Sequence, residues 1–325
     1  MEKKMFSVVL PIYKNELNLG ETVPYILQKS PILFPEFEIE LIMVNDGSPD
    51  HSWEIMEKFQ KQYPKQIRIA RFIRNFGQGA AIHYGISIAR GDVVGVISAD
   101  LQDPFDLFAD MLIEWKNGAD LVCGVRRSRA EHGLGGVLSK QTHILINRFI
   151  NDQYPTGGFD FFLMDRSLAR RFVEIQEKNG STQLLLLWLS QNVHFIPYDR
   201  MERLQGKSSW TLSKKVKYFI DTFVSNSYLP LRIMSLGGAL FSGVAFLMAL
   251  GIVVQTLIMQ RLVPGWSSLA VLTTFFSGLI LLSLGIIGEY LWRIFDEIKQ
   301  KPMYLVGDME EDLGKNSDEE RRDQA

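Results

Sequence analysis

The residues best suited to chemistry follow an apolar run at residues 92–97 and lie in the polar segment 98–104. The β-branched run predicts a strand buried on both faces of a parallel sheet. Open α/β sheets bind ligands at the carboxyl ends of such strands. Side chains alternate along an extended chain, so Asp100 and Gln102 are expected to point to the same side. A carboxylate and an amide oxygen there suit a hard divalent cation with its bound phosphates.

Asp103 has a structural interpretation instead. It precedes Pro104, and this pair is typical of a helix N-cap followed by the first helical residue. Asp103 is therefore expected to cap the helix that follows, which leaves Asp100 and Gln102 without a structural role.

The elements that position these residues alternate between strands and helices from residue 6 to residue 125. Strands are expected at Phe6–Ile12, Glu38–Val44, Ile67–Phe72, Asp92–Ile97 and Asp120–Gly124, with helices at Leu17–Lys29, Ser52–Tyr63, Gln78–Arg90 and Phe105–Lys116. This alternation predicts an α/β fold with a mostly parallel sheet that carries helices on both faces.

Polar residues also end the first three strands, at residues 11–16, 45–48 and 74–77. The carboxyl ends of parallel strands share one edge of a sheet, so these segments form a single rim with the cation-binding candidates and indicate a nucleotide site. There Asp46 is expected to accept a hydrogen bond from the base or ribose, and Glu16 to bond to the base or the adjoining loop. Taken alone, the segment 45–48 is more often an ordinary turn. The first strand is followed by neither a P-loop motif nor a dinucleotide-binding glycine motif, which disfavours both folds.

The composition of the 325-residue chain excludes other classes of protein. The net charge of −2 gives no positive surface for nucleic acid. Cys123 is the only cysteine, which rules out an intrachain disulfide and favours a reducing compartment. The five histidines are scattered without the spacing of metal ligands.

Two long uncharged runs follow residue 230, one between Arg232 and Arg261 and one between Arg261 and Glu289. A bilayer core requires about 20 apolar helical residues. Both runs therefore predict transmembrane helices, at about residues 233–259 and 268–290. Two buried helices of a soluble domain are the alternative, but such helices seldom avoid charge over this length. Glycines in both runs permit close helix contact and association of copies into a homo-oligomer.

Basic residues flank the two runs on their outer sides, at Lys207, Lys214, Lys215, Lys217, Arg232, Arg293, Lys299 and Lys301. The positive-inside rule therefore predicts that both flanks, both termini and the large N-terminal domain lie in the cytoplasm. The segment Lys214–Val224 mixes cations with apolar residues, which predicts an amphipathic helix on the inner leaflet. A plain linker helix is nearly as consistent with this segment.

Four regions follow from this organisation. They are a soluble domain at residues 1–210, juxtamembrane helices at 211–232, a membrane hairpin at 233–293 and a cytoplasmic tail at 294–325. From Gly307 the tail is acidic and polar with little to bury, so disorder is expected there.

Taken together, these segments resemble the inverting glycosyltransferases of family 2, in the branch that transfers a sugar to polyisoprenyl phosphate. The resemblance extends from about residue 7 to residue 306 and is carried by residues 11–16, 45–48, 74–77, 99–104, 159–166, 203–208, 288–294 and 301–304. It implies a GT-A fold held by membrane helices at the cytoplasmic face of the inner (plasma) membrane. It also implies transfer of a hexose from a nucleotide diphosphate sugar to polyprenyl phosphate. In the bacterial branch, the resemblance favours glucose and a UDP-sugar over a GDP-sugar.

The resemblance also implies roles for individual residues. The nucleotide pocket would be formed by Pro11, Tyr13, Glu16, Asp46 and Ser48. Asp100 and Gln102 would bind Mg²⁺ or Mn²⁺ on the diphosphate, and Asp160 is the candidate catalytic base. Arg203 and Ser208 would hold phosphates.

The acceptor phosphate requires cations, and the available set is Arg126, Arg127, Arg129 and Arg203, with Lys207 behind them. Arginine binds phosphate oxygens through paired hydrogen bonds, although a solvated loop is an equally consistent interpretation of residues 126–129. A phosphate monoester has a second pKa of about 6 and is largely dianionic at neutral pH. That phosphate oxygen scarcely needs deprotonation, so Asp160 is expected to orient the sugar hydroxyls or the acceptor, and removal of a proton stays open as its other role. In both cases the metal would neutralise the diphosphate leaving group.

Two departures from the family pattern keep an alternative open. Ser98 replaces the first acid of an Asp-Ala-Asp motif, and Ser209 stands where lysine is usual, with Lys207 nearby as a substitute. A non-catalytic or degenerate membrane partner of a glycan flippase or transferase is therefore the second hypothesis. A processive polysaccharide synthase is less consistent, because the chain has two predicted spans and lacks a Gln-x-x-Arg-Trp motif.

Overall fold

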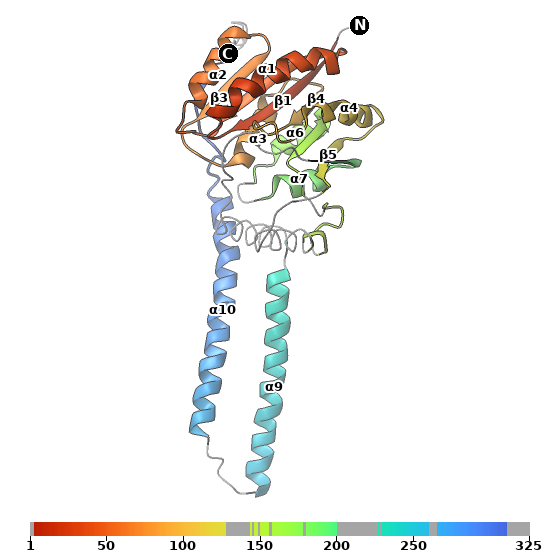
Figure 1. The fold of residues 1–325 in the computed structure, drawn as a ribbon. Helices are drawn as coiled ribbons and strands as arrows, with labels where there is room; N and C mark the ends of the chain where they lie inside the picture. The colour runs from red at the N-terminus through yellow and green to blue at the C-terminus, as the bar shows by residue number, and fades with distance from the viewer. Residues whose placement is uncertain are drawn as a thin grey trace, which may run out of the picture. The chain divides into compact units, whose positions relative to one another are not determined.

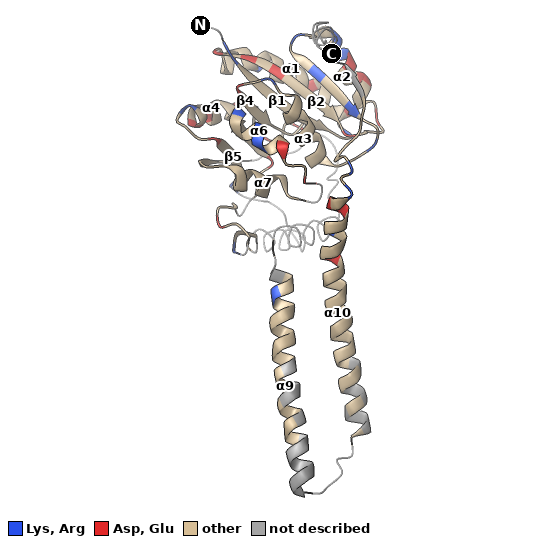
Figure 2. Ribbon diagram, turned by 180° about the vertical axis from the view of Figure 1, so that it is seen from behind, with Lys and Arg blue, Asp and Glu red and all other residues tan. Residues whose placement is uncertain are grey.

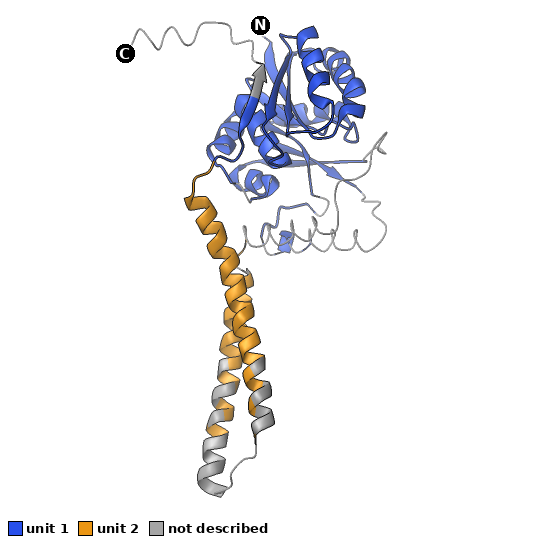
Figure 3. Cartoon of the chain, turned by 90° about the vertical axis from the view of Figure 1, so that its left-hand side faces the viewer, with its two compact units in different colours: residues 1–212, 302–325 blue, residues 213–301 orange. Residues whose placement is uncertain are grey.

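The chain divides into two compact units, and the first of them is discontinuous in sequence. The computed structural model describes residues 3–127, 144, 146–148, 150–155, 158–177, 180–199, 227, 229–259 and 265–310. The first unit comprises Met1–Leu212 and Pro302–Ala325, and the second comprises Ser213–Lys301 (Figure 3). The chain therefore leaves the first unit, forms the second, and returns to the first.

The first unit is built on an eight-stranded mixed sheet of order β7-β5-β6-β4-β1-β2-β3-β8 (Figure 1). Its strands are β1 Lys4–Ile12, β2 Phe37–Asn45, β3 Ile67–Phe72, β4 Val93–Val96, β5 Leu121–Arg126, β6 Phe161–Asp165, β7 Val193–Tyr198 and β8 Val306–Glu310. The pairings β1–β2, β1–β4, β2–β3 and β5–β7 are parallel. Strand β6 is antiparallel to both β4 and β5, and β8 is antiparallel to β3. Six strands therefore run in one direction, as predicted, while β6 and β8 make the sheet mixed.

Helices cover both faces of this sheet, as the alternation of elements predicts. They are α1 Glu16–Leu33, α2 Ser52–Gln62, α3 Gln78–Ile88, α4 Phe108–Lys116, α6 Arg166–Glu174 and α7 Thr182–Leu189, with a 3-10 turn at Phe105–Leu107 before α4. Buried side chains of α1, α2 and α4 pack on the face of β1 that carries Val8 and Leu10. On the opposite face, α3 packs so closely on Val9 that a Cβ at Gly85 would lie 2.3 Å from its side chain.

Aromatic rings fill the core beneath β4 and explain a glycine in that strand. The ring of Phe108 lies 5.2 Å from that of Phe6 and 4.7 Å from that of Phe161, both edge-on. A Cβ at Gly95 would lie 2.6 Å from the Phe108 ring. Only glycine at position 95 allows Phe108 of α4 to pack directly against β4. Phe105 and Phe108 both serve packing, because both are fully buried in the core.

The tail beyond the second unit contains a strand, so the prediction of disorder from Gly307 is wrong for residues 307–310. Residues Val306–Glu310 form β8, which pairs antiparallel with β3 at the edge of the sheet. Just before it, the ring of Tyr304 stacks on that of Phe72 at 5.1 Å and 6°. The Tyr304 hydroxyl lies 3.3 Å from Nδ1 of His83. The acidic composition of the tail gives no sign of this pairing, because an edge strand is stabilised by backbone hydrogen bonds that any sequence can make.

The described part of the second unit contains two long helices, α9 Leu229–Met259 and α10 Trp266–Ile298. Among the described residues, one stretch is long and apolar enough to cross a membrane, Phe275–Ile298, with a mean hydropathy of 1.6. The apolar stretch recognised in α9 is the shorter Pro230–Phe241. Figure 2 shows the charged residues of the two helices near the start of α9 and toward the end of α10.

Candidate active site

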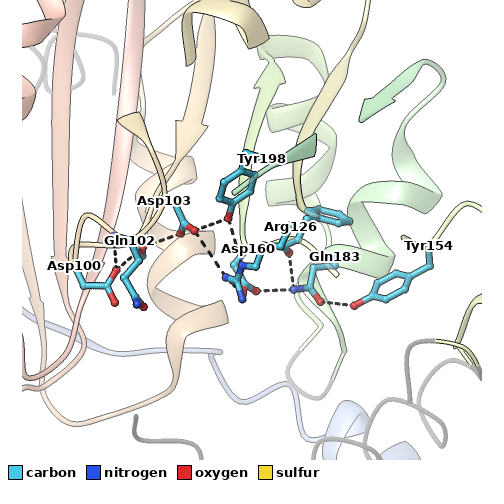
Figure 4. A network of polar contacts seen from close by, with 10 residues as sticks. Asp100, Gln102, Asp103, Arg126, Tyr154, Asp160, Gln183 and Tyr198 are labelled. Atoms are coloured by element: carbon cyan, nitrogen blue, oxygen red, sulfur yellow. Dashed lines mark hydrogen bonds and ion pairs between the residues drawn. The ribbon is translucent and has the colours of Figure 1, made fainter. Parts of the chain in front are cut away.

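The turn after β4 brings Asp100 and Gln102 together, but not in the way that the sequence predicts. Leu101 adopts φ 52°, in a region that residues other than glycine seldom occupy. The chain is therefore not extended here, and the argument from alternating side chains is wrong. Instead, the backbone N–H of Gln102 donates to Oδ1 of Asp100 at 3.3 Å. The two side chains lie next to each other in this tight turn (Figure 4).

Asp103 does not cap the helix that follows it, so that prediction is also wrong. Helix α4 has Leu107 at its N-cap, and the 3-10 turn before it has Pro104 there. The carboxylate of Asp103 accepts a hydrogen bond at 2.5 Å from the hydroxyl of Tyr198, which lies at the end of β7. A local cap pattern cannot reveal a partner that lies 95 residues away in the sequence.

Ser98 links Asp100 and Asp103. Its Oγ lies 2.8 Å from Oδ1 of Asp100 and 2.9 Å from Oδ2 of Asp103. A serine hydroxyl has one hydrogen to donate, so the two carboxylates share a single donor. The residue that departs from the family's acidic pattern therefore holds two acidic residues in place.

Arg126, at the end of β5, is the cation at the centre of this polar network. Its side chain is 10% exposed, and Nη2 lies 3.2 Å from Oδ2 of Asp160 and 3.9 Å from Oδ1 of Asp103. Its Nε donates to the hydroxyl oxygen of Tyr198 at 3.3 Å. Burial lowers the pKa of Arg126, but the two carboxylates outweigh burial and raise that pKa above its ordinary value. Burial and Asp103 also raise the pKa of Tyr198, which keeps its hydroxyl protonated.

Asp160 lies before β6 and is bound on its other oxygen by α7. Its side chain is 43% exposed, and Oδ1 accepts a hydrogen bond from Nε2 of Gln183 at 2.8 Å. The hydroxyl of Tyr154 lies 3.2 Å from Oε1 of Gln183. Polar contacts thus connect the turn after β4 to α7 without interruption (Figure 4).

The predicted nucleotide residues lie at the neighbouring strand ends. The register of β1 and β2 places Ile12 opposite Asn45, so the loops that carry Tyr13 and Asp46 begin at the same level. The carboxylate of Asp46 accepts hydrogen bonds from the backbone N–H groups of Phe76 and Gly77, at 2.6 and 2.9 Å. Burial raises the pKa of Asp46, and these two hydrogen bonds oppose the rise. Asp46 therefore holds the loop after β3, and its contact with a base or ribose stays a prediction.

The loop after β1 is joined to the segment after β2. Glu16 accepts a hydrogen bond from the backbone N–H of His51 at 3.0 Å, and its contact with a base stays a prediction. Ser48 accepts one from the backbone N–H of Lys14 at 2.8 Å. Pro11 lies at the end of β1, and the Tyr13 ring is an exposed hydrophobic group at this edge. An exposed aromatic ring beside a rim of polar groups is suited to stacking on a base.

The predicted phosphate-binding cations are not alike. Arg126 is buried in the network, whereas the side chain of Arg127 is 61% exposed and pairs with Asp199 at 3.4 Å. The solvated-loop interpretation therefore suits Arg127 and does not suit Arg126. The remaining candidates lie outside the described residues, as does the predicted amphipathic helix 214–224; they are Arg129, Arg203, Lys207 and Ser208.

The residues of the turn after β4 fit a divalent cation of the magnesium type. Asp100 and Gln102 are both buried and supply a carboxylate and a carboxamide, which are hard oxygen donors. Within the described ranges there is no group of three or more His, Cys, Asp or Glu that could hold a metal. An ion bound here would therefore take most of its ligands from substrate phosphates and water, which is the usual coordination of Mg²⁺ at phosphate sites.

Three residues of the network were not foreseen from the sequence: Tyr154, Gln183 and Tyr198. Two of them are buried tyrosines, and a buried tyrosine hydroxyl normally has a partner. The sequence gives no indication of which partner that is, because each contact joins residues that are far apart in the chain.

A mixed sheet with polar loops at the carboxyl ends of its parallel strands and a carboxylate–carboxamide turn after β4 (Figure 4) makes this an α/β domain of the GT-A-like type. Residues 7–173 match the profile of Glycosyl transferase family 2, and the chain belongs to this family. It is therefore a glycosyltransferase.

The chain is similar to several curated relatives over nearly its whole length. It is 37% identical to the uncharacterized glycosyltransferase YkcC of Bacillus subtilis, with 93% of each chain covered. It is 30% identical to the prophage bactoprenol glucosyl transferase homolog of Escherichia coli, with 92% of this chain and 97% of that protein covered. Among solved structures, glucosyl-3-phosphoglycerate synthase of Mycobacterium tuberculosis with Mn²⁺ and UDP-glucose has 18% identity and a TM-score of 0.48, over 69% of this chain and 79% of that one. A likeness at that level carries no information on substrate or metal.

Proposed function

We propose that this glycosyltransferase transfers a hexose, with glucose preferred, from a nucleotide diphosphate sugar to polyprenyl phosphate with inversion. The observation that carries the proposal is the polar network that joins the Asp100 turn to the Arg126–Asp160 pair. A metal-bound diphosphate at the Asp100 turn would lie beside a buried cation suited to a phosphate. The relative named as a bactoprenol glucosyl transferase homolog supports a polyprenyl phosphate acceptor.

In this mechanism the two substrates meet between the turn and the arginine. An oxygen of the acceptor phosphate forms a bond to the anomeric carbon, and the bond from that carbon to the nucleotide diphosphate breaks. Asp100 and Gln102 would hold Mg²⁺ or Mn²⁺, which neutralises the diphosphate leaving group when bound. Arg126 would bind the acceptor phosphate, and Asp160 would accept a proton or orient the acceptor. Pro11, Tyr13, Glu16, Asp46 and Ser48 would surround the nucleotide, for which uridine is preferred.

The proposal also includes the membrane arrangement. Residues 1–210 are the catalytic domain, 211–232 the juxtamembrane helices, 233–293 a hairpin with two spans and 294–325 the tail. Both termini face the cytoplasm at the inner membrane, where nucleotide sugars are available. The basic residues on the outer flanks of the hairpin support this orientation.

The direct test is to supply both substrates to purified full-length protein in detergent. Radiolabelled UDP-glucose, UDP-galactose and GDP-mannose are each incubated with polyprenyl phosphate and Mg²⁺. We expect a glycolipid that is labile to mild acid, made fastest from UDP-glucose and lost when EDTA is added. Transfer that proceeds equally well in excess EDTA would contradict metal dependence. A complete lack of glycolipid with all three donors would contradict the acceptor or donor class.

The second hypothesis, a degenerate non-catalytic partner, rests on Ser98 and Ser209, of which Ser209 lies outside the described residues. In the structure Ser98 donates within the Asp100–Asp103 pair. A serine in place of the acid therefore still links Asp100 to Asp103 by hydrogen bonds. This link favours the catalytic hypothesis.

A further inference from the structure

We propose that Gln183 is a positioning residue that sets the orientation of the Asp160 carboxylate for sugar transfer. This inference rests on the proposed function, because Asp160 has a task only if the chain performs that reaction. Gln183 lies in the first turn of α7, a helix for which the sequence indicates no chemical role.

The hydrogen-bond donors of Gln183 are directed at Asp160 and at the residue before it. Its Nε2 lies 2.8 Å from Oδ1 of Asp160 and 2.7 Å from the carbonyl oxygen of Phe159. Carbonyl and carboxylate oxygens accept hydrogen bonds, so the amide must present its NH₂ group here, and both of its hydrogens are used. The two acceptors at this end therefore determine which end of the amide is the NH₂ group. An amide whose neighbours can both donate and accept would leave that assignment open.

The oxygen end of the same amide is anchored as well. Oε1 of Gln183 lies 3.2 Å from the hydroxyl of Tyr154 and 3.4 Å from that of Ser181. Tyr154 is among the most deeply buried large side chains of the protein. The hydroxyl of the fully buried Tyr154 holds the Gln183 amide in place, and the amide holds the Asp160 carboxylate.

The carboxylate needs this support because it is nearly half exposed. Arg126 binds only Oδ2, at 3.2 Å, and one contact leaves a carboxylate free to rotate about its χ2 torsion. The second contact, from α7 to Oδ1, sets the plane of the group. Two donors from separate elements, β5 and α7, therefore hold Asp160 before substrate arrives. A group oriented in advance does not have to be ordered during the reaction.

The test measures kcat and KM for full-length Gln183→Leu and Gln183→Glu. The leucine removes both donors at similar volume, and we expect kcat to fall about 10- to 100-fold, since a misplacement of about 1 Å can cost that much. The KM for the nucleotide sugar should stay within about twofold. The glutamate places a second carboxylate against Asp160 and should be at least as damaging. The matched control is Gln191→Leu, an exposed glutamine just beyond α7, which should behave as wild type.

A double-mutant cycle separates positioning from a general structural effect. If Gln183 acts through Asp160, adding Gln183→Leu to Asp160→Asn should change kcat by less than about twofold. Losses that multiply in the double variant would overturn the positioning role.

Tyr154→Phe keeps the ring and removes the hydroxyl, so it serves as the test if Gln183→Leu does not fold. We expect a severalfold fall in its kcat, and unchanged kcat would also overturn the role. Wild-type protein that makes no glycolipid would overturn the proposed function itself, whereas an active wild type with an unaffected Gln183→Leu overturns only the positioning role.

Discussion

At the scale of residues, the site depends on carboxylates whose environments differ. Asp46 accepts two backbone hydrogen bonds, and Asp103 is buried between Tyr198 and Ser98. Asp160 instead has a partly exposed side chain bound by Arg126 and Gln183. Asp160 is the most exposed of these three carboxylates, which makes it the one best suited to act on the acceptor.

Replacing Asp160 with asparagine tests that role. If the carboxylate accepts a proton, we expect kcat to fall by at least about a hundredfold, which is the usual range for acid–base groups. The measurement is glycolipid formation at saturating concentrations of both substrates. A loss of only severalfold would instead assign Asp160 an orienting role. Asp199→Asn is the matched control, because that carboxylate is 72% exposed and pairs with the exposed Arg127.

At the scale of elements, the regular part of the fold follows from patterns that are local in the sequence. The five predicted strands agree with β1–β5 to within two residues at each end, because each is an apolar run bounded by polar segments. Asp165 caps α6 through a local contact, because its carboxylate accepts a hydrogen bond from the backbone N–H of Ser167 at 2.7 Å. Strand β8 and the network around Arg126 could not be predicted in the same way. Both depend on contacts between distant segments, which a single sequence does not encode in its periodicity.

The return of the chain after α10 predicts an effect on stability. Tyr304→Ala removes a ring that stacks on Phe72 and contacts His83. We expect it to lower the free energy of unfolding by about 2–3 kcal/mol, below the cost of about 3–5 kcal/mol for a fully buried aromatic residue, because Tyr304 is only partly buried. Tyr304→Phe keeps the stacking and should cost about 1 kcal/mol or less. Thermal unfolding of the solubilised protein measures both, and an alanine variant as stable as wild type would show that the segment does not support the domain.

The same cluster predicts a dependence of stability on pH. Burial lowers the pKa of His83 below its ordinary value of 6.5. The unfolded chain therefore binds this proton more readily than the folded protein does. The stabilising contribution is complete above about pH 6.5 and is lost as the pH falls toward the lowered pKa of the folded state. We expect the unfolding temperature of wild type to decline below pH 6.5 more steeply than that of His83→Phe. Parallel curves for the two proteins would contradict this assignment.

At the scale of the whole molecule, two connections of the chain join the first unit to the second unit and its two long helices. The first unit contains segments from both sides of the hairpin in sequence. A two-span hairpin therefore requires that both connections emerge on the same side of the membrane. The two spans can be predicted from the sequence alone, because the long uncharged runs are visible in it.

Cysteine labelling tests this topology, and the native cysteine should contribute little to the signal. The only native cysteine, Cys123, is fully buried, and burial raises the pKa of its thiol well above the ordinary value. A new cysteine should therefore give nearly all of the signal. With a membrane-impermeant maleimide on intact cells, we expect Val263→Cys to be labelled and Ser317→Cys to be labelled only after lysis. Labelling of both positions from outside would contradict two spans.

In the proposed reaction, Asp100 holds the metal ion that assists sugar transfer. The most direct measurement is the rate of glycolipid formation by Asp100→Ala, purified in detergent and compared with wild type across a Mg²⁺ titration. We predict that transfer is abolished at every Mg²⁺ concentration, while membrane insertion and the unfolding temperature are retained. Turnover close to that of wild type would contradict the claim.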